Sequence, residues 1–206
     1  MAATDNKVSV VLLGLGGVGK SCICLKLTQP SQEIPHEHII TPWTDTFQHR
    51  VYLRRGKSVL LEIDDTAGQE EMRALSEVKL DNKDAVILVL SLSDEESLDT
   101  AARWFEKARE KYLRTQREAA QQGKTPKKSK GVERPLPIVV ACNKCDLSGN
   151  EIRVTRETIS ERIQIPENQI IYTSAKTNQN VELLFKTAAE LVLNTGARDS
   201  HNCMIM

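Results

Sequence analysis

Apolar residues occur along the chain in short continuous runs and in stretches of alternating or helical period. Continuous apolar runs, which predict strands buried on both faces, occupy 7–13, 85–92 and 137–142. Alternation over 47–53 predicts a half-buried strand, which the turn at Gly56 joins to a second strand at 58–63. A further strand is predicted over 169–173, and helices over 21–27, 70–79, 93–120, 153–163 and 179–194. This order predicts an α/β fold: a mostly parallel six-stranded sheet with one antiparallel edge strand and helices on both faces.

The composition is that of an ordinary globular domain. The chain has 206 residues, of which 40% are hydrophobic, 27% charged and 4% aromatic. No apolar run approaches the roughly 20 residues of a membrane helix, and the few aromatics argue against a base-stacking nucleic-acid platform. The five cysteines form no even set beside a secretory signal, which indicates a reducing compartment and free thiols. The pairs at 22/24 and 142/145 are expected to serve core packing rather than zinc binding.

A glycine-rich loop follows the first predicted strand. Residues 14–21 (GLGGVGKS) match G-x-x-x-x-G-K-[ST], a pattern whose glycines let backbone N–H groups surround a phosphate. Lys20 would supply positive charge to the outer phosphates, and Ser21 a hydroxyl ligand for Mg²⁺. The expected nucleotide contacts here are Gly14, Leu15, Gly16, Gly17, Val18, Gly19, Lys20, Ser21 and Cys22.

Three further polar strings stand at the carboxyl ends of predicted strands, where open α/β sheets bind ligands. In DTAGQ (65–69) the aspartate can reach a metal through a water, and Gln69 can orient an attacking water. In NKCD (143–146) the Asp146 carboxylate can accept hydrogen bonds from N1–H and the 2-amino group of guanine, which adenine does not offer. In SAK (174–176) the Ala175 N–H can donate to the guanine carbonyl. The expected contacts are Asp65, Thr66, Ala67, Gly68, Gln69, Asn143, Lys144, Asp146, Ser174, Ala175 and Lys176.

With all four strings in this order, the chain resembles a small GTPase of the Ras superfamily over roughly residues 7–194. The strings DTAGQEE, NKCD and SAK, with a prenylation-type end, are most similar to the Ras subfamily. The resemblance implies a P-loop NTPase G domain that binds GTP or GDP with Mg²⁺ and hydrolyses GTP slowly, with Lys20 and Gln69 as its catalytic residues. It also implies an exchange factor, a GTPase-activating protein and effectors as partners. No arginine stands in the phosphate loop, so we expect a partner to supply one.

The loop after the first helix departs from the family pattern. The family uses a threonine there to ligate Mg²⁺ and to close over the γ-phosphate. Spacing to the next strand favours Thr41, whereas counting back from the hairpin turn favours Thr44. The family's aromatic contact to guanine has no counterpart early in this loop, although Trp43 could take its place. The expected metal ligands are Ser21, Thr41 and Asp65.

The last residues form a lipidation pattern. CMIM (203–206) matches C-a-a-X, and its terminal methionine favours a farnesyl group on Cys203. A single prenyl chain gives marginal membrane residence, so a second contact is expected. The basic loop at about 121–135 should emerge on the same side as the tail and is a hypothesis for that contact with an anionic membrane. A solvated insertion, or a patch for a partner or for nuclear targeting, is an equally open interpretation.

The sequence therefore predicts a G domain over 1–194 with the basic loop inserted, and a tail over 195–206. Its expected partners are guanine nucleotide, the regulators, a prenyltransferase and an anionic membrane surface, but no nucleic acid. The expected location is the cytoplasmic face of a membrane, with the plasma membrane favoured. The intact phosphate and DTAGQ strings favour a signalling GTPase. The unusual first loop keeps open a prenylated scaffold that binds nucleotide statically. An ATP-using kinase is contradicted by the guanine-selecting aspartate and the lack of a lid segment.

Overall fold

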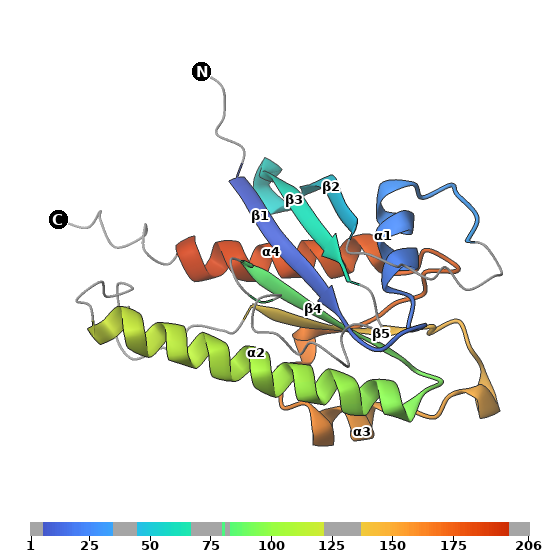
Figure 1. The fold of residues 1–206 in the computed structure, drawn as a ribbon. Coiled ribbons are helices and arrows are strands. Elements are labelled where there is room, and N and C mark those ends of the chain that lie inside the picture. The colour runs from blue at the N-terminus through green and yellow to red at the C-terminus, as the bar shows by residue number, and fades with distance from the viewer. Residues whose placement is uncertain (1–5, 35–44, 67–79, 81–82, 122–136, 198–206) are drawn as a thin grey trace.

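A computed structural model of the chain describes residues 6–34, 45–66, 80, 83–121 and 137–197. Within them, six strands form a single sheet in the order β2-β3-β1-β4-β5-β6 (Figure 1). Their bounds are β1 Asn6–Leu13, β2 Asp45–Tyr52, β3 Ser58–Asp65, β4 Ala85–Ser91, β5 Ile138–Asn143 and β6 Ile170–Tyr172. All neighbouring strands are parallel except β2 and β3, which form an antiparallel hairpin at one edge. The predicted sheet is confirmed.

Helices cover both faces of the sheet, as the alternation of strands and helices predicted (Figure 1). Helix α1 (Lys20–Thr28) and helix α4 (Val181–Ala197) pack on one face, and α2 (Glu95–Gln121) and α3 (Arg156–Arg162) on the other. The connections of the described part of the chain include the short 3-10 helices η1 Arg54–Gly56, η3 Gly149–Glu151 and η4 Glu167–Gln169. Among the described residues, no helix is long and apolar enough to cross a membrane.

The core lies in two layers on either side of the central strands. Every residue of β4 is buried, which fits its continuous apolar sequence. Val8, Val10 and Leu12 of β1 pack toward α1 and α4, whereas Val11 and Leu13 pack toward α2 and α3. Trp104 of α2 lies in this core and is 1% exposed.

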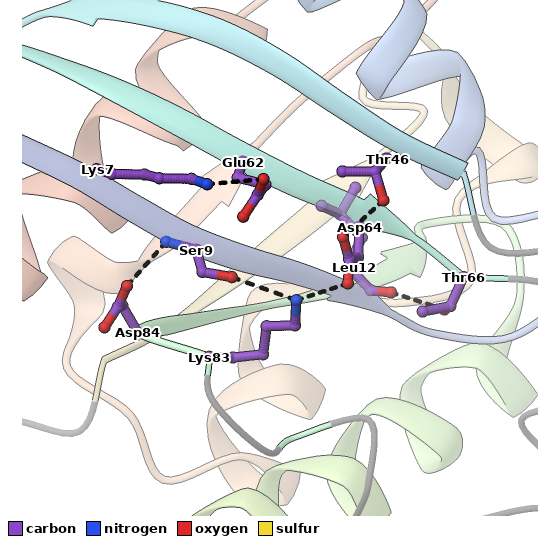
Figure 2. A network of polar contacts seen from close by, with 9 residues as sticks. All are labelled: Lys7, Ser9, Leu12, Thr46, Glu62, Asp64, Thr66, Lys83 and Asp84. Atoms are coloured by element: carbon purple, nitrogen blue, oxygen red, sulfur yellow. Dashed lines mark hydrogen bonds and ion pairs between the residues drawn. The ribbon is translucent and has the colours of Figure 1, made fainter.

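The expectation that β1 is apolar on both faces is wrong for its first half, where a polar network covers the sheet (Figure 2). The Lys83 amine lies 2.6 Å from Asp64 Oδ2 and donates to Ser9 Oγ at 3.2 Å. Thr46 Oγ1 of β2 donates to Asp64 Oδ1 at 3.1 Å. The reason is that Lys7, Ser9 and Asp64 are polar residues on this part of the sheet, and each is satisfied by a polar partner there.

Element ends differ from the predicted ones by a few residues. The third described helix was predicted from 153, but it begins at Arg156. The N–H groups of Arg153 and Val154 both donate to Leu92 O, which keeps the chain extended up to the Thr155 cap. The first edge strand ends at Tyr52 rather than 53, because Leu53 N–H already turns to donate to Lys57 O. The predicted helix 70–79, the basic loop and the C-terminal tail lie outside the described residues.

Candidate functional site

The phosphate loop connects β1 to the start of α1. Its backbone turns through positive φ angles of 76° at Gly17 and 98° at Gly19, conformations that glycine adopts without steric cost. Lys20 opens the helix and is only 5% exposed. Its amine donates to Gly14 O at 2.7 Å and to Leu15 O at 3.1 Å. The loop's own carbonyls therefore hold a buried positive charge inside the loop.

Two glycines of this loop stand against neighbouring strands too closely for any side chain. A Cβ on Gly14 would lie 2.1 Å from the backbone oxygen of Val89 in β4. A Cβ on Gly19 would lie 2.3 Å from Asn143 Nδ2 at the end of β5. The glycine pattern is thus required by contacts to distant parts of the chain as well as by backbone conformation.

Asp65 ends β3 beside this loop and has the chemistry of a cation ligand. Its side chain is 0% exposed, and neither carboxylate oxygen has a hydrogen-bond partner of normal geometry in the described structure. Burial raises the pKa of Asp65, while the nearby Ser21 hydroxyl and the Lys20 charge lower it. An orphaned buried carboxylate near a hydroxyl offers the hard oxygen ligands that Mg²⁺ prefers. The residues present fit this ion.

Thr66 follows directly and connects β3 to β1. Its hydroxyl donates to Leu12 O at 2.8 Å and is buried (Figure 2). This contact fixes where the DTAGQ string leaves the sheet. The remaining predicted residues near the terminal phosphate, Ala67, Gly68, Gln69, Thr41 and Thr44, lie outside the described residues, as does Cys203.

Asn143 joins three of the four sequence strings. Its Nδ2 donates to Val18 O of the phosphate loop at 2.8 Å. Its Oδ1 accepts from the Ala175 N–H at 3.1 Å and from the Thr173 hydroxyl at 3.4 Å. The side chain is 2% exposed, so both ends of the amide are satisfied without water. The phosphate loop and the two guanine strings are therefore held together at the carboxyl edge of the sheet.

The Ala175 N–H was predicted to donate to the guanine carbonyl, but here it donates to Asn143 Oδ1. The physical reason is that the amide oxygen is buried and needs a donor. A contact of the same N–H with guanine would have to be shared between two acceptors. That contact stays a prediction.

The Asp146 carboxylate is positioned by the SAK string. Ser174 Oγ donates to Asp146 Oδ1 at 2.6 Å and accepts from the Thr177 N–H at 3.1 Å. Lys176 Nζ lies 4.0 Å from Asp146 Oδ2. Lys144, between Asn143 and Asp146, has a positive φ of 65°, which turns the chain sharply at the end of β5. One carboxylate oxygen is thus held by serine, and the other faces the lysine.

Sequence reasoning missed the connections that hold these strings in place. It named Asn143 as a contact but gave it no partner, and it overlooked Thr173, Asp64 and Lys83. The charged Asp64 near the end of β3 was a signal for a polar partner, although nothing in the sequence identified Lys83. Cys24 and Cys142 are buried free thiols, and burial raises the pKa of Cys142 to about 12. In the described part of the chain, no group of three or more His, Cys, Asp or Glu residues could hold a metal ion.

Comparison with known proteins agrees with this geometry. The family model of the Ras family matches residues 9–194. "Ras-related protein Rab-13" of Rattus norvegicus is 29% identical over 97% of this chain and 87% of its own length. "Ras-related protein RIC1" of Oryza sativa subsp. japonica is 31% identical over 92% of this chain and 82% of its own length. "Ras-related protein SEC4" of Candida albicans is 26% identical, covering 92% and 79% respectively.

Proposed function

The chain belongs to the Ras family of small GTPases and is a GTP-hydrolysing switch, and from this premise we propose that it hydrolyses GTP slowly and signals to effectors from a membrane surface. The main support for a nucleotide site is the pair of hydrogen bonds that Asn143 forms with Val18 O and with the Ala175 N–H. Through them the phosphate loop and the guanine strings share one buried connector at the sheet edge. A ligand that spans phosphate and base suits this arrangement.

The phosphate end supplies charge neutralisation. The buried Lys20 amine can exchange its carbonyl partners, Gly14 O and Leu15 O, for phosphate oxygens without moving out of the loop. Mg²⁺, when bound, would neutralise developing charge on the phosphates, and the Ser21 hydroxyl, the Asp65 carboxylate and Thr41 would hold it. Asp65 suits this role because its carboxylate is buried and neither of its oxygens has a hydrogen-bond partner of normal geometry among the described residues.

The hydrolytic water would be oriented by Gln69, which follows Asp65 by four residues. The arginine that stabilises transition-state charge in this family would come from an activating protein, because residues 14–21 contain none. The unaided chain is therefore slow, and a GTPase-activating protein and an exchange factor set the lifetime of each state.

The base end selects guanine. The Asp146 carboxylate accepts the N1–H and 2-amino hydrogen bonds, with Ser174 Oγ fixing its orientation. Adenine presents no such pair of donors, so ATP would leave this carboxylate unpaired in the site. A polar site left unpaired in this way discriminates strongly against the wrong ligand.

Attachment to the membrane would occur through a farnesyl group added to Cys203 by a prenyltransferase. The expected location is the cytoplasmic face, with the plasma membrane favoured. Because one prenyl chain binds only marginally, a second and electrostatic contact to anionic lipid is needed.

The test is single-turnover hydrolysis of preloaded GTP with Mg²⁺, with release of GDP followed in parallel. The unmodified chain is compared with Gln69→Leu and with the control Gln164→Leu, a change at an exposed glutamine in the turn after α3. Slow hydrolysis that Gln69→Leu abolishes and Gln164→Leu preserves would support the switch. No turnover, or turnover indifferent to Gln69, would contradict it and favour the prenylated scaffold with static nucleotide.

A further inference from the structure

The end of the β2–β3 hairpin concentrates positive charge on the side of the domain opposite the nucleotide site. Residues 50–57 contain four basic residues, Arg50, Arg54, Arg55 and Lys57, and no acidic one. In the turn, Leu53 N–H donates to Lys57 O at 2.8 Å, and Gly56 adopts a φ of +70°. This turn places Arg54 and Lys57 at the tip of a closed hairpin.

The charges at this tip are available to a partner. Arg54 and Lys57 are exposed, and neither side chain forms an ion pair or hydrogen bond with any residue that the structure describes. Tyr52 stands beside them at 67% exposed, the most exposed large hydrophobic residue among those described. An aromatic ring with a polar tip beside unpaired cations suits the boundary between water and lipid headgroups.

The nearest acidic side chain along β3 is already neutralised. Glu62 Oε1 lies 2.9 Å from the Lys7 amine of β1 (Figure 2). The ion pair leaves no free carboxylate from Glu62 to offset the charge at the tip. Glu62 therefore does not offset the charge of Arg54 and Lys57.

The hairpin lies beside the point where the chain leaves the domain. Leu53 packs against the same core cluster as Leu191, Val192 and Leu193 near the end of α4. Figure 1 shows the β2–β3 turn, the start of β1 and the end of α4 together on the left of the domain, away from the phosphate loop. Cys203 follows Ala197, the last residue of α4, by six residues. Six extended residues span at most about 20 Å, so a lipid on Cys203 would keep this end of the domain close to the bilayer.

We propose that the hairpin face, formed by Tyr52, Arg54 and Lys57, lies against an anionic lipid bilayer and orients the domain with its nucleotide site away from the membrane. The tether to the bilayer rests on the proposed lipidation of Cys203, whereas the charge and exposure of the hairpin do not. Each basic residue close to an anionic surface contributes about fivefold in binding. Two neutralised positions are therefore worth about 30-fold.

The experiment measures binding of the full chain to vesicles of phosphatidylcholine with and without about 30% phosphatidylserine, at low salt. Both the farnesylated and the unlipidated chain are tested, and farnesylation of Cys203 is verified by mass. The variant Arg54→Gln/Lys57→Gln is compared with Arg103→Gln/Arg153→Gln, which removes the same charge from exposed positions elsewhere on the domain. Thermal unfolding checks that all variants fold.

The hairpin variant is expected to lose about 30-fold in binding to serine-containing vesicles and nothing on neutral vesicles, and the control to change by less than about threefold. Amide hydrogen exchange over residues 50–58 should slow when anionic vesicles are added. Equal losses in both variants, or no loss in the hairpin variant, would overturn the proposal. A loss of binding to soluble polyglutamate without a loss on vesicles would also overturn it, in favour of an acidic protein partner. If Cys203 accepts no lipid, the anchor proposal fails, while the unlipidated chain still decides the role of the hairpin.

Discussion

The replacement Gly19→Ala tests whether the phosphate loop depends on its contact with Asn143. The new methyl group would lie 2.3 Å from Asn143 Nδ2, well inside van der Waals contact. To relieve the clash, the amide must withdraw from Val18 O, to which it now donates at 2.8 Å. The donor and acceptor are buried, so leaving them unpaired costs about 1–3 kcal/mol. A positive φ of 98° adds about 1–2 kcal/mol of backbone strain for alanine.

Gly56→Ala provides the matched control. Gly56 also has a positive φ, of 70°, but no atom lies within 4 Å of the position that a Cβ would occupy there. It should therefore cost only the backbone strain of about 1–2 kcal/mol. The predicted excess for Gly19→Ala is about 1–3 kcal/mol, which shifts a urea midpoint by roughly 1 M for a domain of this size.

Urea unfolding of nucleotide-free protein, followed by circular dichroism, measures both changes. In the background of Asn143→Ala, where the clashing amide is absent, Gly19→Ala should cost no more than Gly56→Ala does. The double-mutant cycle would then give a coupling of about 1–3 kcal/mol. Equal costs for the two glycine variants, or a cycle without coupling, would refute the steric argument.

Two further predictions concern the base end of the site and the sheet edge. Ser174→Ala removes the 2.6 Å hydrogen bond to Asp146, and it should weaken GDP binding about tenfold in a fluorescence titration, because hydrogen bonds to charged groups contribute about 1.5–3 kcal/mol. The control Ser148→Ala changes an exposed serine in the connection after β5 that carries Asp146, and it should leave the affinity unchanged. Burial lowers the pKa of His49 below its ordinary 6.5, against the opposing charge of Glu182, so the unfolded chain takes up a proton first as the pH falls. The His49 contribution to the free energy of unfolding should therefore be fully present above about pH 6.5 and decrease on acidification. In urea titrations between about pH 7.5 and 5.5, His49→Gln should flatten the dependence of the free energy of unfolding on pH. An unchanged dependence would show that His49 is not its source.

Much of the fold was predictable because the spacing of apolar residues along a helix or strand indicates which of its faces is buried in the core. The buried run of β4 and the alternation of β2 both gave the correct element, and the short crossovers required parallel pairing. Boundaries were less predictable, because they depend on tertiary hydrogen bonds. Leu92 O accepts from the N–H groups of Arg153 and Val154 and so delays the start of α3 until after Thr155, the threonine N-cap that is the local signal for that start.

The site shows the same division. Lys20, Asp65, Asn143, Asp146 and Ser174 were chosen from sequence, since phosphate, metal and base each require a particular donor or acceptor at a strand end. The hydrogen-bond partners of these residues could not be predicted from sequence, because a side chain's partner depends on which residues the fold brings within about 3 Å.

The sequence by itself determined the order of elements and the residue types at the carboxyl edge of the sheet, since both are local properties of period and chemistry. Only the tertiary structure decided that Asn143 meets Val18 across 125 positions of the chain. The same holds for the pairing of Asp64 with Lys83 and for the basic hairpin beside the end of α4. Such contacts arise when sheet order and helix packing bring distant segments together, and the free energy of burying polar groups then selects the pairs that satisfy one another.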